Sequence, residues 1–176
     1  MGIFDFMKSA GSSISDKSEE EKAAKAAAEA QASAEAQAKY EAVLAEINRS
    51  TSEKLTSSIA AMGFPTDSLT VGFDGAKGLA TLTGSVPSQE VREKVILLVG
   101  NHQGIGQVDD QLTVESPEPE AVFYTVVKGD SLSKIAKAQY GDAMKYPVIF
   151  EANKPMLTDP DLIYPGQVLR IPPLAS

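Results

Sequence analysis

Few residues in this sequence could carry out acid–base or covalent chemistry. The 176 residues include no cysteine and a single histidine, His102. Disulfides, thiolate metal sites and thiol catalysis are therefore excluded, and any imidazole chemistry would depend on this one residue. A histidine that acts as a general base needs a partner to orient it, and the sequence around His102 offers none. We therefore expect no enzyme, and no catalytic residue is predicted.

Two further patterns fail as catalytic or phosphate sites. Asp109 and Asp110 are neighbours on a predicted strand, so their side chains point to opposite faces and cannot share a proton. We expect both, like Asp159 and Asp161, to be exposed edge and turn residues. The glycine run Gly100–Gly106 follows a helix and is not followed by Lys-Ser or Lys-Thr, so it is not a phosphate loop.

Charge and hydropathy exclude other classes of function. The chain has 16 basic and 24 acidic residues and a formal net charge of −8. Such a field repels nucleic acid, so no nucleic-acid partner is expected. The apolar runs are too short for a membrane span. The first residues also lack the basic region and the apolar length of a secretory signal, which predicts a cytoplasmic protein.

The N-terminal part contains two predicted helical segments. Residues 1–13 form a short N-terminal helical segment, because their apolar residues are close to helical spacing and are followed by glycine. Residues 14–49 form a long Ala/Glu-rich helical insert, which we expect to be solvated, although a spacer or weak coiled coil is the alternative. Ser50 with Glu53 is a capping signal that suggests a new helix near Thr51. The helical insert has one apolar face, which consists of Tyr40, Val43, Leu44 and Ile47. This face suggests a dimer, although we expect a monomer.

Residues 50–115 predict the order helix, strand, strand, helix, strand. The first helix has one apolar face and ends at Gly63. The strands show alternating apolar residues, and Ser88 caps the second helix, which Gly100 closes. The faces expected to be buried consist of Leu55, Ile59 and Met62; Leu69, Val71 and Phe73; Ala80 and Leu82; Val91, Val95, Leu98 and Val99; and Val108, Leu112 and Val114.

Two segments resemble known domain families. The run Gly104-Ile105-Gly106-Gln107-Val108-Asp109-Asp110-Gln111-Leu112-Thr113-Val114, after Thr83-Gly84-x-Val86, resembles the BON domain, an α-β-β-α-β sandwich. Residues 116–121 then form an acidic linker with two prolines. Residues 122–173 resemble the LysM domain, a βααβ unit, through Tyr124-Thr125-Val126, Gly129-Asp130-Ser131-Leu132, Tyr140-Gly141, Ala152-Asn153 and Tyr164-Pro165-Gly166-Gln167-Val168-Leu169-Arg170-Ile171-Pro172. The expected fold class is therefore α+β, with two small domains.

LysM domains are glycan readers of peptidoglycan and chitin, and the resemblance implies an N-acetylglucosamine groove between two loops. Backbone groups with a small apolar floor suit an acetamido sugar. The alternative is that these residues hold only the fold or contact the other domain. The groove positions would be Gly129, Asp130, Ser131 and Leu132, with Asn153, Lys154, Pro155, Met156 and Ile163 opposite.

The pairing of the two domains behind the start MGIFDFMKSAG resembles the bacterial cytoplasmic potassium-binding proteins of the BON–LysM type. The resemblance covers residues 1–13 and 50–172. It implies a K⁺ sensor in which main-chain oxygens hold the ion, with no catalytic role. The implied ligands are Met7, Ala10, Ser12, Gly100, His102 and Ile105.

The residues offer independent physical reasons for cation binding. K⁺ suits a cage of neutral carbonyl oxygens, and helix C-termini leave their last carbonyls unpaired. Glycine-terminated helix ends are predicted at Met7–Gly11 and Leu98–Gly100. If Gly100 has a positive φ, a β-branched residue there should disrupt the site. A peptidoglycan-binding protein of the cell envelope stays open as the second hypothesis.

Overall fold

The structure is a computed structural model that describes residues 19–174, and its compact units divide between Ala42 and Val43. The predicted N-terminal segment of residues 1–13 lies outside the described residues. In chain order the elements are α1 (Glu19–Ala61), β1 (Leu69–Asp74), β2 (Leu79–Ser88), α2 (Gln89–Gly100), β3 (Gln107–Ser116), β4 (Val122–Thr125), α3 (Leu132–Tyr140), the 3₁₀ helix η1 (Ala143–Lys145), α4 (Tyr146–Ala152) and β5 (Val168–Ile171).

Helix α1 is one continuous helix of 43 residues, so the predicted start of a new helix near Thr51 is wrong. Glu53, the acidic residue of the expected cap, instead pairs with Arg49 NH1 at 2.8 Å along the helix surface. Two neighbouring hydroxyls bond carbonyl oxygens inside the helix. Ser52 Oγ donates to the carbonyl oxygen of Asn48 at 2.9 Å, and Thr56 Oγ1 donates to that of Ser52 at 2.9 Å. A hydroxyl bound to the carbonyl four residues earlier is compatible with a helix interior.

In the first unit, every described side chain from residue 25 to residue 42 is exposed. This is the solvated helix that the alanine-rich composition predicts, because alanine alone gives no wide apolar stripe to bury. Two residues of the predicted apolar face belong to the second unit and are also accessible: Val43 is 59% exposed and Ile47 is 48% exposed.

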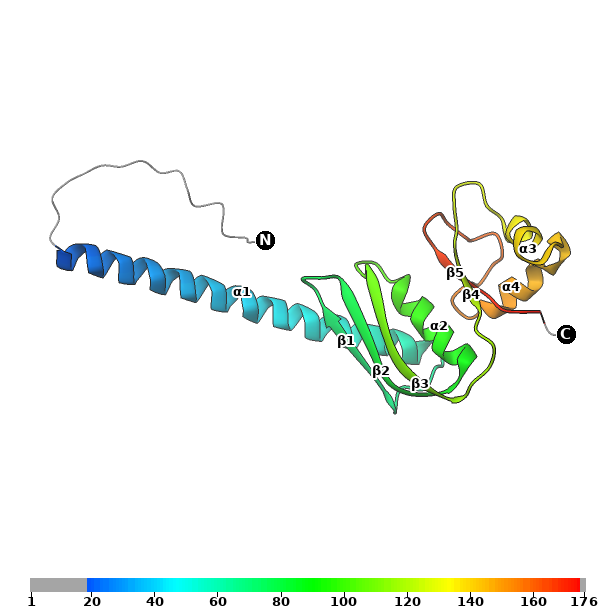
Figure 1. Cartoon of the computed structure of the whole chain (residues 1–176), viewed down its shortest axis with the longest axis horizontal. Helices are drawn as coiled ribbons and strands as arrows, with labels where there is room; N and C mark the ends of the chain where they lie inside the picture. Colours follow the sequence, from blue (N-terminus) through cyan, green and yellow to red (C-terminus); the bar gives the residue numbers. More distant parts are fainter. Residues whose placement is uncertain (1–18, 175–176) are drawn as a thin grey trace. The chain divides into compact units, whose positions relative to one another are not determined.

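The second unit begins with a three-stranded sheet of order β1-β2-β3. The β1–β2 pair is antiparallel, and the β2–β3 pair is parallel with α2 as the crossover. Figure 1 shows α2 lying along one face of this sheet. The C-terminal part of α1 packs into the same core. That core contains Leu55, Ile59, Leu69, Val71, Ala80, Leu82, Val86, Val95, Val99 and Leu112.

The predicted order of helices and strands in this domain is confirmed. One residue of its predicted core, Met62, is not buried. The N-cap Ser88 accepts a hydrogen bond from the backbone N–H of Val91 at 3.3 Å, as the capping pattern indicates. The α1 helix stops before Gly63, whose φ of +83° suits only glycine. Met62, however, is 38% exposed, whereas its helical spacing from Ile59 predicted burial.

The second domain is a two-stranded antiparallel sheet, β4 with β5, and its helices, which confirms the strand–helix–helix–strand order. Ser131 caps α3, and Gly141 ends it with a φ of +77°. Figure 1 shows α3 and α4 beside the paired strands. The core of this domain is small and contains Val126, Leu132, Ile135, Ala136, Ile149, Leu157, Leu169 and Ile171.

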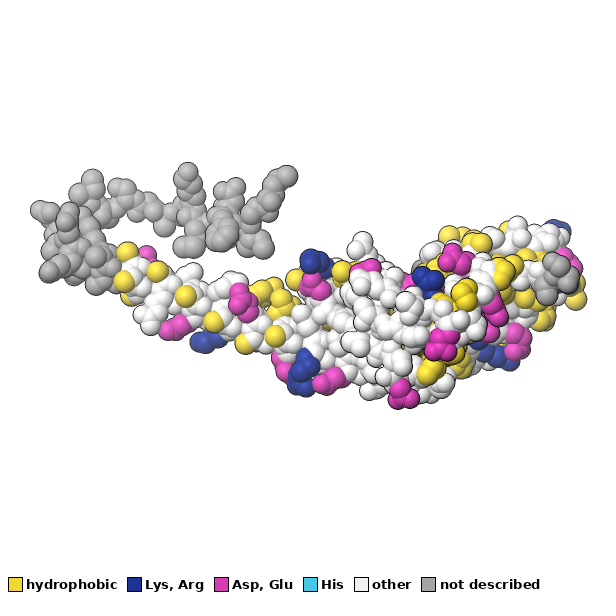
Figure 2. Space-filling model, turned by 60° about the horizontal axis from the view of Figure 1, so that its bottom comes forward, with side chains coloured by type: hydrophobic (Ala, Val, Ile, Leu, Met, Phe, Trp, Pro, Cys, Tyr) yellow, Lys and Arg dark blue, Asp and Glu magenta, His cyan; other side chains and the backbone are white. Residues whose placement is uncertain are grey.

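Charged side chains of both signs are interspersed on the face that Figure 2 draws, and they do not gather in one basic patch there. Among residues 19–174, no helix is both long and apolar enough to cross a bilayer.

Candidate functional site

The turn after α2 contains three of the residues that the sequence suggested as ligands. Helix α2 ends at Gly100, and the backbone N–H of His102 donates to the carbonyl oxygen of Val99 at 3.0 Å. The N–H of Ile105 then donates to the carbonyl oxygen of His102 at 3.2 Å. These bonds fold Gly100, His102 and Ile105 into one short turn at the C-terminal end of the helix.

Several carbonyl oxygens of this turn have no donor among the described residues. Within residues 19–174, the carbonyl oxygens of Gly100, Asn101, Gly104 and Ile105 accept no hydrogen bond, whereas that of His102 is engaged in the turn. The C-terminal end of a helix also carries partial negative charge. The turn therefore presents neutral oxygens in an electrostatic field that favours a cation.

The far end of the turn is held by the neighbouring hairpin. The backbone N–H groups of Gly106 and Gln107 donate to the carbonyl oxygen of Gly78, at 2.8 and 3.2 Å. Gly78 closes the β1–β2 turn, whose Gly75 N–H in turn donates to Asn48 Oδ1 of α1 at 2.8 Å. The start of β3 is thus fixed to the hairpin, while the carbonyl oxygens of Gly100 and Ile105 stay without a donor among the described residues.

The described residues offer no other obvious metal site. Among residues 19–174, no group of three or more His, Cys, Asp or Glu side chains could hold a metal ion. Met7, Ala10 and Ser12, which the sequence joins to the same ligand set, lie outside the described residues. An ion at the turn would therefore depend on backbone oxygens from the described part of the chain.

Glycine in this turn is required at Gly104 and not at Gly100. Gly104 has a φ of +93°, whereas Gly100 is not among the residues with positive φ. A Cβ at Gly100 would meet only Val108 Cγ2 at an ordinary distance of 3.5 Å. The condition that would have made Gly100 intolerant of a side chain is thus not met, because the left-handed position lies four residues later.

Asn101 joins this turn to the second domain. Its Nδ2 donates to the carbonyl oxygen of Val168 at 2.9 Å, and its Oδ1 accepts from the backbone N–H of Val168 at 2.8 Å. A carboxamide that bonds both backbone groups of one residue takes the place of a neighbouring strand. Strand β5 is therefore paired with β4 on one edge and with Asn101 on the other.

A buried ion pair joins the same helix to the same strand. Arg170 Nε lies 2.6 Å from Glu93 Oε2, and the side chains of Arg170 and Glu93 are 9% and 4% exposed. Glu93 Oε1 also accepts from Gln89 Nε2 and from the backbone N–H of Ala121, each at 2.8 Å. These bonds satisfy the carboxylate fully, which a buried charge requires.

The sequence analysis missed this second buried face of α2. Gln89, Glu93 and Leu97 are buried at intervals of four, and Asn101 follows at the same interval. The 3.6-residue period could have indicated a second stripe, but two of its members are polar, and polar residues are normally taken as exposed. Asp110 was also misjudged, because its carboxylate is 17% exposed and pairs with Arg92 NH2 at 2.7 Å.

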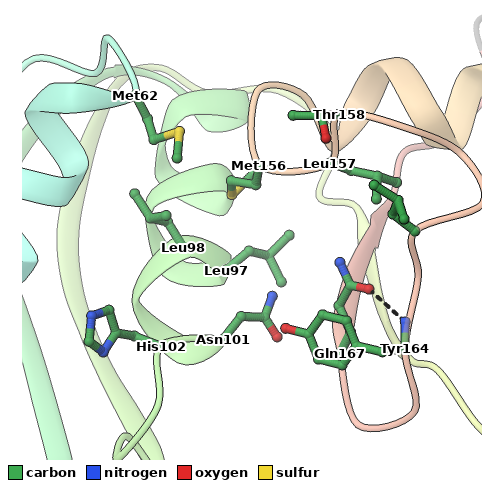
Figure 3. Close-up of a pocket in the computed structure, with 11 residues that line it drawn as sticks. Met62, Leu97, Leu98, Asn101, His102, Met156, Leu157, Thr158, Tyr164 and Gln167 are labelled. Atoms are coloured by element: carbon green, nitrogen blue, oxygen red, sulfur yellow. Dashed lines mark hydrogen bonds between the residues drawn. The ribbon is translucent and has the colours of Figure 1, made fainter.

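A cleft of about 390 Å³ opens beside Asn101 between the two domains of the second unit. Figure 3 shows Met62 and Leu98 on one side and Tyr164 and Gln167 on the other, with the imidazole of His102 directed away from Gln167. The lining is largely apolar. The eleven lining residues are Met62, Leu97, Leu98, Asn101, His102, Met156, Leu157, Thr158, Leu162, Tyr164 and Gln167.

The structure does not bring all of the suggested glycan residues to one groove. Ser131 and Leu132 line a pocket of about 210 Å³, together with Ser133, Tyr146, Pro160 and Asp161. Met156 lines the other cleft, and Ile163 packs against the core of its domain. Lys154, which precedes Pro155, pairs with Glu151 through its Nζ at 2.7 Å. The same Nζ lies over the Phe150 ring.

Three of the suggested glycan residues are engaged in the fold. Asn153 is 2% exposed, and its carboxamide bonds the backbone of Arg170. Asp130 Oδ2 accepts from the hydroxyl of Tyr124 at 2.9 Å, which raises the pKa of Tyr124. The carbonyl oxygen of Gly129 accepts from Lys134 Nζ at 2.8 Å.

Comparison with known domain families matches most of the second unit. Residues 49–116 match the BON domain, and residues 124–172 match the LysM domain. The first domain described above is therefore a BON domain and the second a LysM domain, both in an α+β fold.

Comparison with known proteins finds relatives of different extent. The potassium binding protein Kbp of Escherichia coli is 43% identical over 173 residues, which cover 98% of this chain and 99% of that protein. An uncharacterized protein of Deinococcus radiodurans is 59% identical over 102 residues and 40% of its length. An esterase of Mycobacterium tuberculosis is 49% identical over 53 residues, only 11% of its length.

We expect removal of one partner of the buried ion pair to destabilise the domain interface strongly. Glu93→Ala leaves the Arg170 guanidinium buried without its carboxylate, which should lower the free energy of unfolding by about 3–5 kcal/mol. Urea denaturation followed by circular dichroism measures this difference.

Glu151→Ala is the matched control, because it removes a carboxylate that is 64% exposed from a surface pair with Lys154. An exposed pair contributes about 0–1 kcal/mol, so this variant should unfold almost as the wild type does. Similar small effects of both substitutions would show that the interface does not depend on the ion pair.

Proposed function

Because the chain belongs to the family of the potassium binding protein Kbp, we propose that it binds K⁺ and acts as a binding protein rather than an enzyme. The observation that carries the proposal is the full-length similarity to that relative, together with a turn in which the carbonyl oxygens of Gly100 and Ile105 have no donor among the described residues. The esterase match supports no hydrolase activity, since it covers only a small part of that enzyme.

The chemistry of the turn fits K⁺ better than a small divalent ion. K⁺ is coordinated by neutral carbonyl oxygens that replace its hydration shell. Mg²⁺ keeps several waters and is usually bound through carboxylates, and the turn between Gly100 and Ile105 contains no acidic residue. We propose that Gly100, His102 and Ile105 contribute carbonyl oxygens, and that Met7, Ala10 and Ser12 complete the ligand set.

A sensor role follows from this distribution of ligands. An ion held by the N-terminal segment and by the turn joins parts of the chain that are far apart in sequence, so its occupancy changes which segments are tied together. Such a protein reports the K⁺ concentration through its conformation. We propose the cytoplasm as its setting, as the resemblance to cytoplasmic relatives implies.

We expect K⁺ to stabilise the protein more than Na⁺ does. A ligand that binds only the native state stabilises it by about 2.7 kcal/mol at 100 times its Kd. For a domain of this size that should raise Tm by several degrees. Thermal unfolding in matched KCl and NaCl solutions tests this, because Na⁺ controls for ionic strength.

Deletion of residues 2–11 tests the N-terminal ligands in the same experiment. The truncated protein should lose the K⁺-specific rise in Tm while the LysM domain stays folded. A wild type with equal Tm in both salts would contradict K⁺ binding, whereas a full K⁺ effect in the truncated protein would place the ligands elsewhere.

We expect the backbone of Gly104 to matter more for K⁺ affinity than the side chain of His102. Gly104→Val forces a β-branched residue to a φ of +93° and should distort the turn, weakening K⁺ binding about tenfold or more. His102→Ala removes a side chain whose Nδ1 lies 3.1 Å from the carbonyl oxygen of Gln103, and should change the affinity little. Titration calorimetry with K⁺ compares the two variants, and a larger loss for His102→Ala would contradict a backbone site.

The LysM match and the pocket at Ser131 and Leu132 favour a second candidate function, binding of an N-acetylglucosamine glycan. We expect Tyr146→Ala, which removes an exposed ring from this pocket, to reduce retention on purified peptidoglycan. Tyr164→Ala removes a ring from the other cleft and should leave retention unchanged. If the wild type is not retained, the LysM domain of this chain does not read peptidoglycan.

A further inference from the structure

Asn101 occupies a distinctive position in the turn. It lies between Gly100 and His102, two of the proposed ligands, yet its own side chain points to the LysM domain and bonds both backbone groups of Val168. Figure 3 shows the Asn101 carboxamide directed toward Gln167 and away from His102. The backbone on either side of Asn101 is therefore tied to strand β5.

Strand β5 offers Asn101 a continuous row of backbone groups. Val168 and Arg170 are two residues apart, so their backbone N–H and C=O groups point to the same edge of the strand, the edge that does not face β4. Asn153 Oδ1 accepts from the N–H of Arg170 at 2.8 Å, and its Nδ2 donates to the carbonyl oxygen of Arg170 at 2.8 Å. Two asparagines, one from each domain, thus pair the edge of β5 as a third strand would.

The strand to which Asn101 is tied is itself fixed. Its opposite edge pairs with β4, and Arg170 forms the buried ion pair with Glu93 of α2. Glu93 and Asn101 lie eight residues apart on the same side of the helix, so strand and helix end are held at two separate points. The attachment point at Val168 cannot follow the turn without breaking these contacts.

We propose that Asn101 is a positioning residue that sets the width of the carbonyl turn and thereby favours K⁺ over Na⁺. This inference rests on the proposed K⁺ function. Na⁺ is smaller than K⁺, so the same oxygens must move closer together to coordinate it. A turn held open by Asn101 resists that contraction, whereas a free turn adapts to either ion, so the selectivity depends on rigidity as well as on the ligands.

The test compares ion selectivity in full-length variants by calorimetric titration with KCl and with NaCl. Asn101→Ala should lower the ratio of K⁺ to Na⁺ affinity about tenfold, which corresponds to about 1.4 kcal/mol. Gln89→Ala is the matched control, because it also removes a carboxamide from the buried face of α2 but lies far from the turn, next to Glu93. Its ratio should stay within about twofold of that of the wild type.

The outcomes separate the two proposals. An unchanged ratio in Asn101→Ala, or an equal fall in both variants, overturns the role of Asn101 and leaves K⁺ binding intact. A wild type that binds no K⁺ overturns the proposed function and this inference with it. If Asn101→Ala does not fold, hydrogen exchange of the Val168 amide in the wild type tests the proposal instead. K⁺ should slow this exchange several-fold more than Na⁺ does. Equal protection by the two ions overturns the proposal.

Discussion

The pairing of the free edge of β5 is the constraint on which the arrangement of the second unit depends. A two-stranded sheet leaves one edge of each strand without partners, and unpaired buried backbone groups are costly. Here the edge is paired by Asn153 from within the LysM domain and by Asn101 from the BON domain. The free edge of β5 is therefore paired at both Val168 and Arg170 only when the two domains are in contact, so the domains specify each other's position.

The ion pair between Glu93 and Arg170 adds directionality to this contact. Removing two charges from water costs about as much as their attraction returns, so such a pair is weak evidence for high stability. Its geometry is nonetheless demanding, because the carboxylate also accepts from Gln89 and from the N–H of Ala121. Ala121 is the last residue of the linker, so one carboxylate binds the α2 helix, the end of the linker and the last strand. We infer that the pair is kept for the register of the domains rather than for net stability.

Much of the fold could be predicted from the sequence because apolar periodicity and capping are local signals. Ser88 and Gly100 mark the ends of α2 where the structure has them. The new helix near Thr51 failed because Glu53, expected to bond back to a free N–H at a helix start, pairs with Arg49 inside a continuous helix, and the pattern of residues does not distinguish the two arrangements. The polar face of α2 was missed for a related reason: burial of Glu93 needs Arg170, which lies 77 residues away in the sequence.

A site built from carbonyl oxygens has no side-chain signature, since every residue carries the same ligand atom. The residues that determine such a site are those that shape the backbone: Gly104 through its positive φ, Gly78 through the hydrogen bonds that hold the start of β3, and Asn101 through its bonds to Val168. None of these residues contributes a side chain to the proposed site. It follows that sequence similarity can indicate that a family binds an ion while the properties of the site change from member to member, wherever contacts from another domain set the geometry of the backbone oxygens.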